Sequence, residues 1–278
     1  MPRHNTPPER RARQQERIAD ARRQAARSPG ERRTEALWIY GIHPVLAALA
    51  NPQRKVLRIL ATANALARLS EAGAAFSVPP EETTPRDLDT LVGGDAVHQG
   101  VAIEAMPLAP LGLDALEGAK LVVVLDQLTD PQNVGAILRS AVAFAADAVI
   151  STGRHSAAET GTLAKAASGA LDRIRWIEVP NLARALEEIG ALGFTRIGLD
   201  SEGTTELEEA IAGDRIALVL GAEGKGLRRL TRDTCDTVAR LSVPGAIASL
   251  NVSNAAALSL YLASRHLRPA RGNATRSP

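Results

Sequence analysis

The sequence lacks several residues and patterns on which common protein functions depend. Only one of its 278 residues is a cysteine, Cys235, so no disulfide forms within the chain and a reducing compartment is expected. The five histidines show no metal-ligand spacing with that cysteine, which predicts no metal site. No run approaches the roughly 18 apolar residues that span a bilayer, and no apolar segment of the signal-peptide type begins the chain. The sequence therefore predicts a cytoplasmic protein without a membrane segment.

Aromatic residues are also scarce, at 3% of the chain, and the basic residues are unevenly distributed. Residues 1–35 contain ten arginines against five acidic residues, a net charge of +5, which leaves −3 for the rest of a chain whose total is +2. Because this segment has almost no large apolar residues, we expect a disordered tail, with a second one at 268–278. Arginine-rich tails bind phosphate backbones without sequence preference, although a purely solubilising role is an equal alternative.

Residues 36–107 are predicted to form a small α/β domain. From Trp38 to Leu49 the chain is expected to enter a short helix. Apolar patterning then predicts strands at 56–60 and 101–105 and helices at 63–72 and 85–91, with Gly73 closing the first of these helices. Prolines and glycines between Pro107 and Gly118 indicate a linker, which we place at residues 108–119.

From Lys120 onward predicted strands and helices alternate, which favours a parallel sheet with helices on both faces. The apolar run 121–125 is typical of a buried strand, and an apolar stripe at helical spacing follows Asp130, a candidate N-cap. Arg139 lies off that stripe, so it faces a crevice or solvent. Further strands are predicted at 148–151, 174–179, 196–200, 216–220 and 238–243, and helices at 157–167, 182–192 and 250–266.

Three polar clusters follow strand-like apolar runs in this half of the chain, at residues 130–140, 221–229 and 245–254. Loops beyond the strand ends of a parallel sheet turn backbone N–H groups and short side chains toward a ligand crevice. The polar residues of the last cluster could equally serve only to cap the final helix. Together the clusters predict a shared binding site.

The glycine cluster at 221–226 matches neither common nucleotide motif. Its spacing is not G-x-G-x-x-G, and Val219 stands where a P-loop needs its first glycine. A nicotinamide or triphosphate site is therefore disfavoured, whereas an adenosine-type cofactor and a plain tight turn both remain open. The sequence also contains no Gly-x-Ser-x-Gly elbow and no strong paired-carboxylate motif, so hydrolysis is not indicated.

In their order and spacing, the three clusters resemble the SpoU-type RNA ribose 2′-O-methyltransferases of the SPOUT superfamily. The matching phrases are Asp130-Pro-x-Asn-x-Gly-Ala-x-x-Arg-Ser, Leu220-Gly-x-Glu-Gly-x-Gly and Ser249-Leu-Asn-Val-Ser. Two further phrases, Ile39-Tyr-Gly-Ile-His-Pro and Ala96-Val-His-Gln-Gly, look like the substrate-recognition domain of the bacterial 23S rRNA guanosine 2′-O-methyltransferase branch. The resemblance spans residues 37–266.

The resemblance implies transfer of a methyl group from S-adenosylmethionine to a ribose 2′-hydroxyl of RNA, with a guanosine of 23S rRNA favoured and no metal needed. The implied catalytic residues are Arg139, Asn133, Glu223, Ser249 and Asn251. The implied cofactor contacts are Gly221, Ala222, Leu241, Val243, Gly245 and Leu250.

The resemblance also implies a fold. A methyltransferase domain at 120–267 would end in a deep trefoil knot, threaded by residues 216–230 and 238–262, after a small ribosomal-protein-like RNA-binding domain. Members of the family are homodimers with active sites at the subunit boundary. The chain departs from the family at Leu241-Ser-Val-Pro-Gly245, where the usual phrase is Ile-Pro-Met-x-Gly, so we expect a different backbone there.

Three other functions compete with this interpretation. A tRNA methyltransferase of the same type is disfavoured by the separate N-terminal domain, which suits recognition of folded rRNA by shape. A non-catalytic RNA-binding assembly factor is disfavoured by the intact motif residues. An oxidoreductase on a Rossmann sheet lacks its fingerprint.

Overall fold

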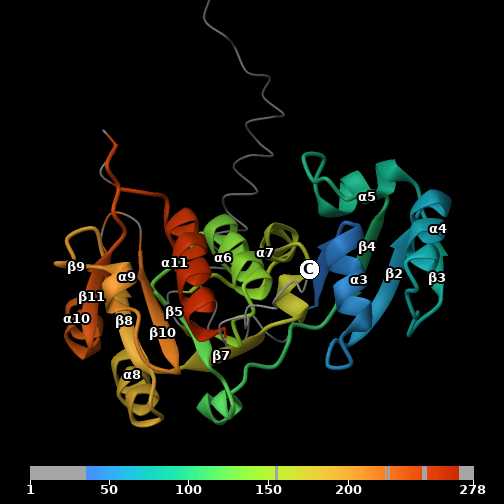
Figure 1. Ribbon diagram of the computed structural model, residues 1–278. Coiled ribbons are helices and arrows are strands. Elements are labelled where there is room, and N and C mark those ends of the chain that lie inside the picture. Colours follow the sequence, from blue (N-terminus) through green and yellow to red (C-terminus); the bar gives the residue numbers. More distant parts are fainter. Residues whose placement is uncertain (1–35, 154–155, 223, 225, 246–248, 269–278) are drawn as a thin grey trace, which may run out of the picture.

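The computed structural model describes residues 36–153, 156–222, 224, 226–245 and 249–268. These residues form two sheets with helices packed on them (Figure 1). The first sheet has four strands in the order β1-β4-β2-β3, and the second has seven in the order β7-β6-β5-β10-β8-β11-β9. The disordered tails expected at 1–35 and 268–278 fall outside the described residues, apart from Arg268.

The first sheet contains β1 (Leu37–Tyr40), β2 (Val56–Ala61), β3 (Pro80–Glu82) and β4 (Val101–Ala105). Its helices are α3 (Ile42–Ala50), α4 (Ala63–Glu71) and α5 (Pro85–Val92). The strands predicted at 56–60 and 101–105 and the helices predicted at 63–72 and 85–91 are confirmed within one or two residues. The prediction that the chain enters a helix from Trp38 missed one strand. Residues 37–40 first pair antiparallel with β4, and Gly41, at φ 94°, then turns the chain into α3.

The second sheet is parallel throughout, as predicted. Its strands are β5 (Leu121–Asp126), β6 (Ala148–Thr152), β7 (Arg175–Val179), β8 (Thr195–Leu199), β9 (Thr205–Glu206), β10 (Ile216–Gly221) and β11 (Thr237–Arg240). The sequence did not predict β9, since two polar residues give no periodic signal. The five predicted strands beyond 121–125 all exist with small shifts at their ends.

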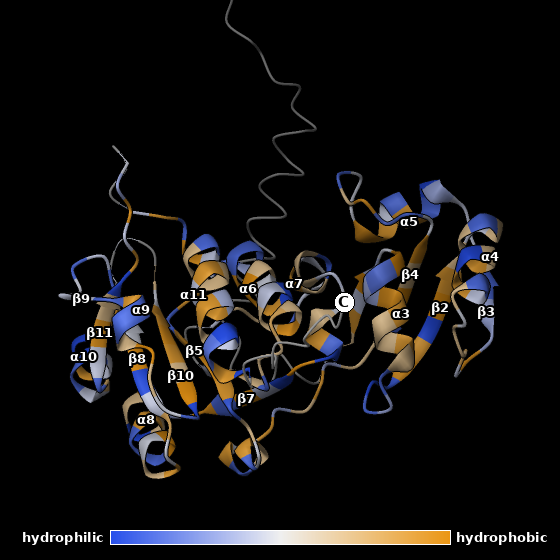
Figure 2. Cartoon of the chain, in the orientation of Figure 1, coloured by the Kyte–Doolittle hydropathy of each residue, from blue (hydrophilic) through white to orange (hydrophobic). Residues whose placement is uncertain are grey.

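Helices cover both faces of this sheet, again as predicted (Figure 1). Val123 of β5 packs with α6 (Pro131–Ala143), α7 (Gly161–Ala167) and α11 (Val252–Leu267), while Val122 and Val124 pack on the opposite side with α8 (Leu182–Ala191). Figure 2 shows the resulting apolar strands between more polar helices. The short helices are η1 (Leu113–Leu116), η2 (Ala170–Asp172), α9 (Leu207–Ala210) and α10 (Arg229–Thr234). In the described part of the chain, none of the helices has the length and apolar character to cross a membrane.

Two helices begin later than predicted. Helix α7 starts at Gly161 rather than at residue 157, because Thr160 caps it by accepting from Leu163 N at 3.2 Å. Helix α11 starts at Val252 rather than at residue 250, with Asn251 as its N-cap. In both places the residues before the cap have no regular secondary structure.

The two sheets meet where β1 and α3 pack against α7 and η2. A Cβ atom at Gly161 would collide with the backbone oxygen of Trp38, so the missing side chain lets α7 approach β1 closely. The predicted linker takes part as well, because Leu111 N donates to Trp176 O at 3.0 Å and Glu178 N donates to Leu111 O at 3.1 Å. The linker thus extends the edge of the second sheet beside β7.

Candidate functional site

A cavity of about 620 Å³ lies at the carboxyl ends of β8, β10 and β11. This is the edge at which parallel sheets open a ligand crevice, and the volume falls within the roughly 300–1,000 Å³ of small-molecule pockets. Its described walls are residues 199–202, 220–222, 224, 226–227, 232, 239, 241, 243, 249–252 and 255. The segments after three neighbouring strands therefore converge on one space with the start of α11.

The glycine cluster forms one wall of this cavity as a tight turn. Gly226 N donates to Ala222 O at 2.9 Å, and Gly224 and Gly226 adopt φ values of 73° and 61°, which favour glycine. A Cβ atom at Gly221 would collide with the backbone of Gly226. The turn can therefore close only because these positions lack side chains, which leaves its backbone as the lining of the cavity.

Two carboxylates, which the sequence analysis missed, hold the walls in place: one is buried and the other has its side chain 11% exposed. Asp126, 1% exposed at the end of β5, accepts from Arg228 N at 3.0 Å and from Arg228 Nε at 2.6 Å. Asp200, beyond β8, accepts from Arg232 Nη1 at 2.9 Å. Each acid lies at the carboxyl end of a predicted strand, and this position was the sequence signal that could have identified it as a site residue. The first pair ties the glycine turn to the neighbouring strand β5.

The start of α11 joins this cavity to the first polar cluster. Asn251 accepts from Ser253 N at 2.9 Å through Oδ1, which confirms the capping role considered for this cluster. Its Nδ2 donates to Asn133 Oδ1 at 3.0 Å. Asn133 lies in the first turn of α6, which Asp130 caps by accepting from Gln132 N at 3.1 Å. Two motifs that are 118 residues apart in sequence therefore meet through their amide side chains.

The structure brings most of the implied residues together. Those that line the cavity are Gly221, Ala222, Leu241, Val243, Ser249, Leu250 and Asn251. Asn133 is attached to them by its hydrogen bond, while Gly245 is described but does not line the cavity. Glu223 lies outside the described residues. Arg139 projects from α6 with its side chain exposed, as its position off the apolar stripe predicted.

The Cys235 thiol is held in its protonated form. Burial raises the pKa of the Cys235 thiol to about 12, and its Sγ donates to Thr231 O at 3.2 Å, so the thiolate form is suppressed. Among the residues that the structure describes, no three His, Cys, Asp or Glu side chains group so that they could hold a metal ion. The cavity offers backbone, hydroxyl and amide groups for binding and alignment, together with the charged side chains of Asp200, Glu202 and Arg232.

Comparison with known sequences identifies the family. Residues 120–261 match the model described as the SpoU rRNA Methylase family, and residues 38–111 match RNA 2'-O ribose methyltransferase substrate binding. The chain is 40% identical over 240 residues to the 23S rRNA (guanosine-2'-O-)-methyltransferase RlmB of Xylella fastidiosa (strain 9a5c), which covers 82% of this chain and 96% of that protein. It is 41% identical over 235 residues to RlmB of Ralstonia nicotianae, and the match covers 82% of this chain and 94% of that protein.

Solved structures share the fold. The SpoU methyltransferase AviRb from Streptomyces viridochromogenes, in complex with the cofactor AdoMet, superposes with a TM-score of 0.71 at 23% identity, covering 87% of this chain and 94% of that one. An AdoMet-bound rRNA methyltransferase from Sinorhizobium meliloti superposes with a TM-score of 0.70 at 21% identity, and the match covers 91% of this chain and 95% of that one. These matches confirm the expected α/β fold, a parallel sheet flanked by helices. As its three motifs indicated, the chain belongs to the SpoU rRNA methylase family.

Proposed function

We propose that this protein transfers a methyl group from S-adenosylmethionine to the ribose 2′-hydroxyl of a guanosine in 23S rRNA. The observation that carries the proposal is the Asn251–Asn133 hydrogen bond, which joins two motifs beside a cavity lined by the glycine turn. Relatives about 40% identical over nearly their whole length carry this activity in their names.

The cavity suits S-adenosylmethionine. The glycine turn exposes backbone groups at close range, and Leu241, Val243 and Leu250 offer apolar contacts for an adenosine group. Gly245 falls outside the lining, which agrees with the shifted proline at Pro244 presenting a different backbone there. When bound, the cofactor supplies an electrophilic methyl group.

The side chains then align the reacting ribose. Ser249 and Asn251 would hydrogen-bond the sugar, a role supported by their position in the cavity lining and by the hydrogen bond that orients the Asn251 amide on Asn133. Arg139 cannot act as the base because a guanidinium stays protonated under nearly all conditions. Its role is to orient the RNA and stabilise the developing oxyanion, while an RNA phosphate or a water takes the hydroxyl proton. Glu223 is proposed as a further residue of this site.

A homodimer would complete the site. Helix α11 exposes Leu258 and Tyr261 by 48% and 44%, and it packs beside α6, which carries the exposed Arg139. A paired apolar surface there would bring Arg139 of one copy toward the cavity of another. The trefoil knot at 216–230 and 238–262 is part of the same proposal, since the chain leaves β11 near one edge of the sheet and returns to pack α11 on α6 and β10.

The division of the chain follows from the same function. Residues 36–107 are proposed as a ribosomal-protein-like RNA-binding domain, 108–119 as the linker and 120–267 as the methyltransferase domain. The arginine-rich segment 1–35 would add contacts to RNA phosphates, and the protein would act in the cytoplasm, where 23S rRNA is found.

Methyl transfer from labelled S-adenosylmethionine to 23S rRNA and tRNA transcripts tests the proposal. The expected result is label in 23S rRNA alone, located at a ribose by mass mapping. Label in tRNA alone would move the function to a tRNA methyltransferase. RNA binding without any binding of S-adenosylmethionine would identify a non-catalytic factor.

A further inference from the structure

The cavity at the glycine turn has charged side chains in its lining that lie outside the three polar clusters. Asp200 and Glu202 come from the segment after β8, and Arg232 comes from α10. Arg232 Nη1 donates to Asp200 Oδ2 at 2.9 Å, so these two charges largely cancel. No cation among the described residues forms an ion pair with the carboxylate of Glu202. Glu202 therefore adds a negative charge to the cavity that this ion pair does not neutralise.

Backbone contacts fix the position from which the Glu202 side chain extends. Its N–H donates to Asp200 Oδ1 at 3.0 Å, Gly203 N donates to Asp200 O at 3.0 Å, and Asp200 N donates to Ala239 O at 3.0 Å. A Cβ atom at Gly203 would collide with the backbone of Ala239 in β11, so the turn lies directly on that strand. The Glu202 side chain itself is exposed, so its carboxylate is accessible to a ligand although its backbone is held.

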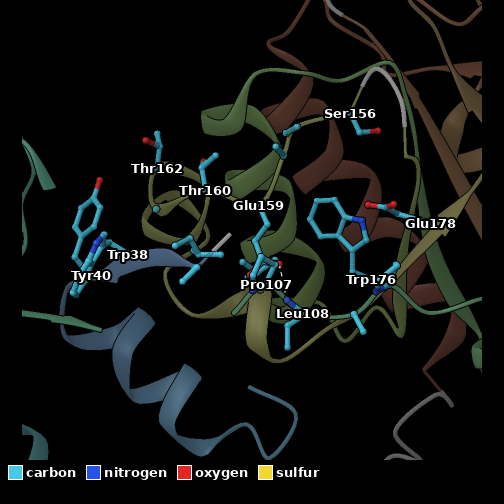
Figure 3. A pocket seen from close by; sticks show the side chains of 18 of the residues that line it. Trp38, Tyr40, Pro107, Leu108, Ser156, Glu159, Thr160, Thr162, Trp176 and Glu178 are labelled. Atoms are coloured by element: carbon cyan, nitrogen blue, oxygen red, sulfur yellow. Dashed lines mark hydrogen bonds between the residues drawn. The ribbon is translucent and has the colours of Figure 1, made fainter. Parts of the chain in front are cut away.

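A second cavity, of about 440 Å³ between the two sheets, shows how a lining carboxylate serves the fold instead (Figure 3). There Glu159 accepts from Arg54 and from Leu108 N at 3.0 Å, so its charge is used within the protein. The carboxylate of Glu202 accepts no hydrogen bond from the described residues and stabilises no buried group. An acid that is free in this way, in the lining of a ligand cavity, indicates recognition of a positive charge.

We propose that Glu202 selects the positively charged methyl donor over its product, an inference that rests on the proposed function. S-adenosylmethionine carries a sulfonium cation. In the transfer, the ribose oxygen forms a bond to the methyl carbon and the sulfur keeps the electron pair of the broken S–C bond, while the hydroxyl proton passes to an RNA phosphate or a water. The product, S-adenosylhomocysteine, is therefore a neutral thioether.

The comparison between these two molecules isolates the charge. They share the adenosine, the amino group and the carboxylate, and they differ only in the methyl group and the charge of the sulfur. A carboxylate at the cavity attracts the charged sulfur and has no such effect on the neutral one. After the transfer this attraction is lost, so the product binds more weakly than the donor and a new donor molecule replaces it.

Calorimetric titration of S-adenosylmethionine and S-adenosylhomocysteine into the full chain tests the proposal. Glu202→Gln should lower the affinity for S-adenosylmethionine roughly fivefold at low salt, the effect of one charge pair near contact in a water-exposed setting. The affinity for S-adenosylhomocysteine should stay unchanged. Because Glu202 is exposed, the difference between the two molecules should shrink when the salt concentration rises to about 0.5 M.

Two further variants separate the charge from the shape of the side chain. Glu202→Asp keeps the charge and should retain most of the preference for S-adenosylmethionine, whereas Glu202→Lys reverses the charge and should weaken S-adenosylmethionine binding more than Glu202→Gln does. The matched control is Glu208→Gln in α9, which removes the same charge from an exposed residue outside the cavity lining and should leave both affinities unchanged.

The outcomes distinguish this proposal from the proposed function. Equal weakening of both molecules by Glu202→Gln would mean that the carboxylate contacts a group that they share, and this result, like unchanged affinities, would overturn the selection by charge while methyl transfer to 23S rRNA still supports the function. If the preference depends on Glu202 but no methyl group reaches 23S rRNA, the selection stands and the proposed function fails. If the unsubstituted chain binds neither molecule, both fail.

Discussion

Arg54 makes polar contacts between the two sheets, and its removal tests how these contacts contribute to the stability of the protein. The side chain is 0% exposed; its Nε donates to Asp172 Oδ1 at 2.8 Å and its Nη1 donates to Met106 O at 3.0 Å and to Glu159. The side chain of Asp172 is 2% exposed and that of Glu159 is 17% exposed, so the Arg54–Asp172 pair has almost no access to water. Burial raises the pKa of Glu159, although the Arg54 guanidinium opposes that effect.

Arg54→Met keeps the volume of the side chain and removes its charge, leaving two buried carboxylates without a cation. Breaking a buried ion pair from one side costs about 3–5 kcal/mol in the free energy of unfolding. Urea titration followed by tryptophan fluorescence reports this loss where it occurs, since both tryptophans lie beside the cluster. The matched control is Arg58→Met, whose ion pair with Glu81 is exposed and should be lost without measurable effect.

The penalty should also depend on pH, and its sign follows from the direction of the shift. A carboxyl group whose pKa is raised in the folded protein destabilises it above that pKa, and protonation relieves the cost as the pH falls. The difference in the free energy of unfolding between Arg54→Met and the unsubstituted protein should therefore become smaller at acidic pH, where Glu159 becomes neutral. A difference in the free energy of unfolding below about 1 kcal/mol at neutral pH would show that Arg54 does not join the two sheets. A difference that grows on acidification would refute the same assignment.

Four further results are expected. Arg139→Ala should nearly abolish methyl transfer while binding of S-adenosylmethionine measured by calorimetry persists; equal loss of both would end the division of roles proposed here. Gly221→Ala should weaken cofactor binding at least tenfold, because its Cβ collides with the backbone of Gly226, and undiminished affinity would show that the turn does not hold the cofactor. Cys235 should react with a maleimide at pH 8 at least a hundredfold more slowly than a free thiol, given its pKa of about 12. Deleting residues 1–35 should weaken RNA binding and flatten its salt dependence; identical binding across salt concentrations would exclude a role in phosphate contact.

The sequence predicted the central fold because its signals are local and periodic. Continuous apolar runs such as 121–125 can only be buried strands in a sheet covered on both faces, and the Asp130 cap is a short-range contact. The elements that escaped prediction lack such periodicity: β3 and β9 are short and polar, and α10 has a single buried residue. Their positions depend on neighbours distant in sequence.

The sequence predicted which segments converge on the candidate cavity but not the geometry of their contacts. Spacing identified the segments that meet at the cavity, yet no local rule pairs Asn251 with Asn133 or Asp126 with Arg228. Gly135 belongs to the first polar cluster, but a Cβ there would collide with Ala166, so its role is the close packing of α6 on α7. The cavity between the two sheets was missed because β1 and β7, which both line it, are more than 130 residues apart in the sequence.

The two cavities should fail independently, because different contacts hold their walls. Arg54 donates to Glu159, and Glu159 accepts from Leu108 N, so these two lining residues of the cavity between the sheets lose their support if that guanidinium is removed. The glycine turn is tied instead by Arg228 to Asp126, at the end of β5. Folded Arg54→Met protein should therefore retain its affinity for S-adenosylmethionine. Loss of that affinity would mean that packing between the sheets also shapes the cofactor cavity.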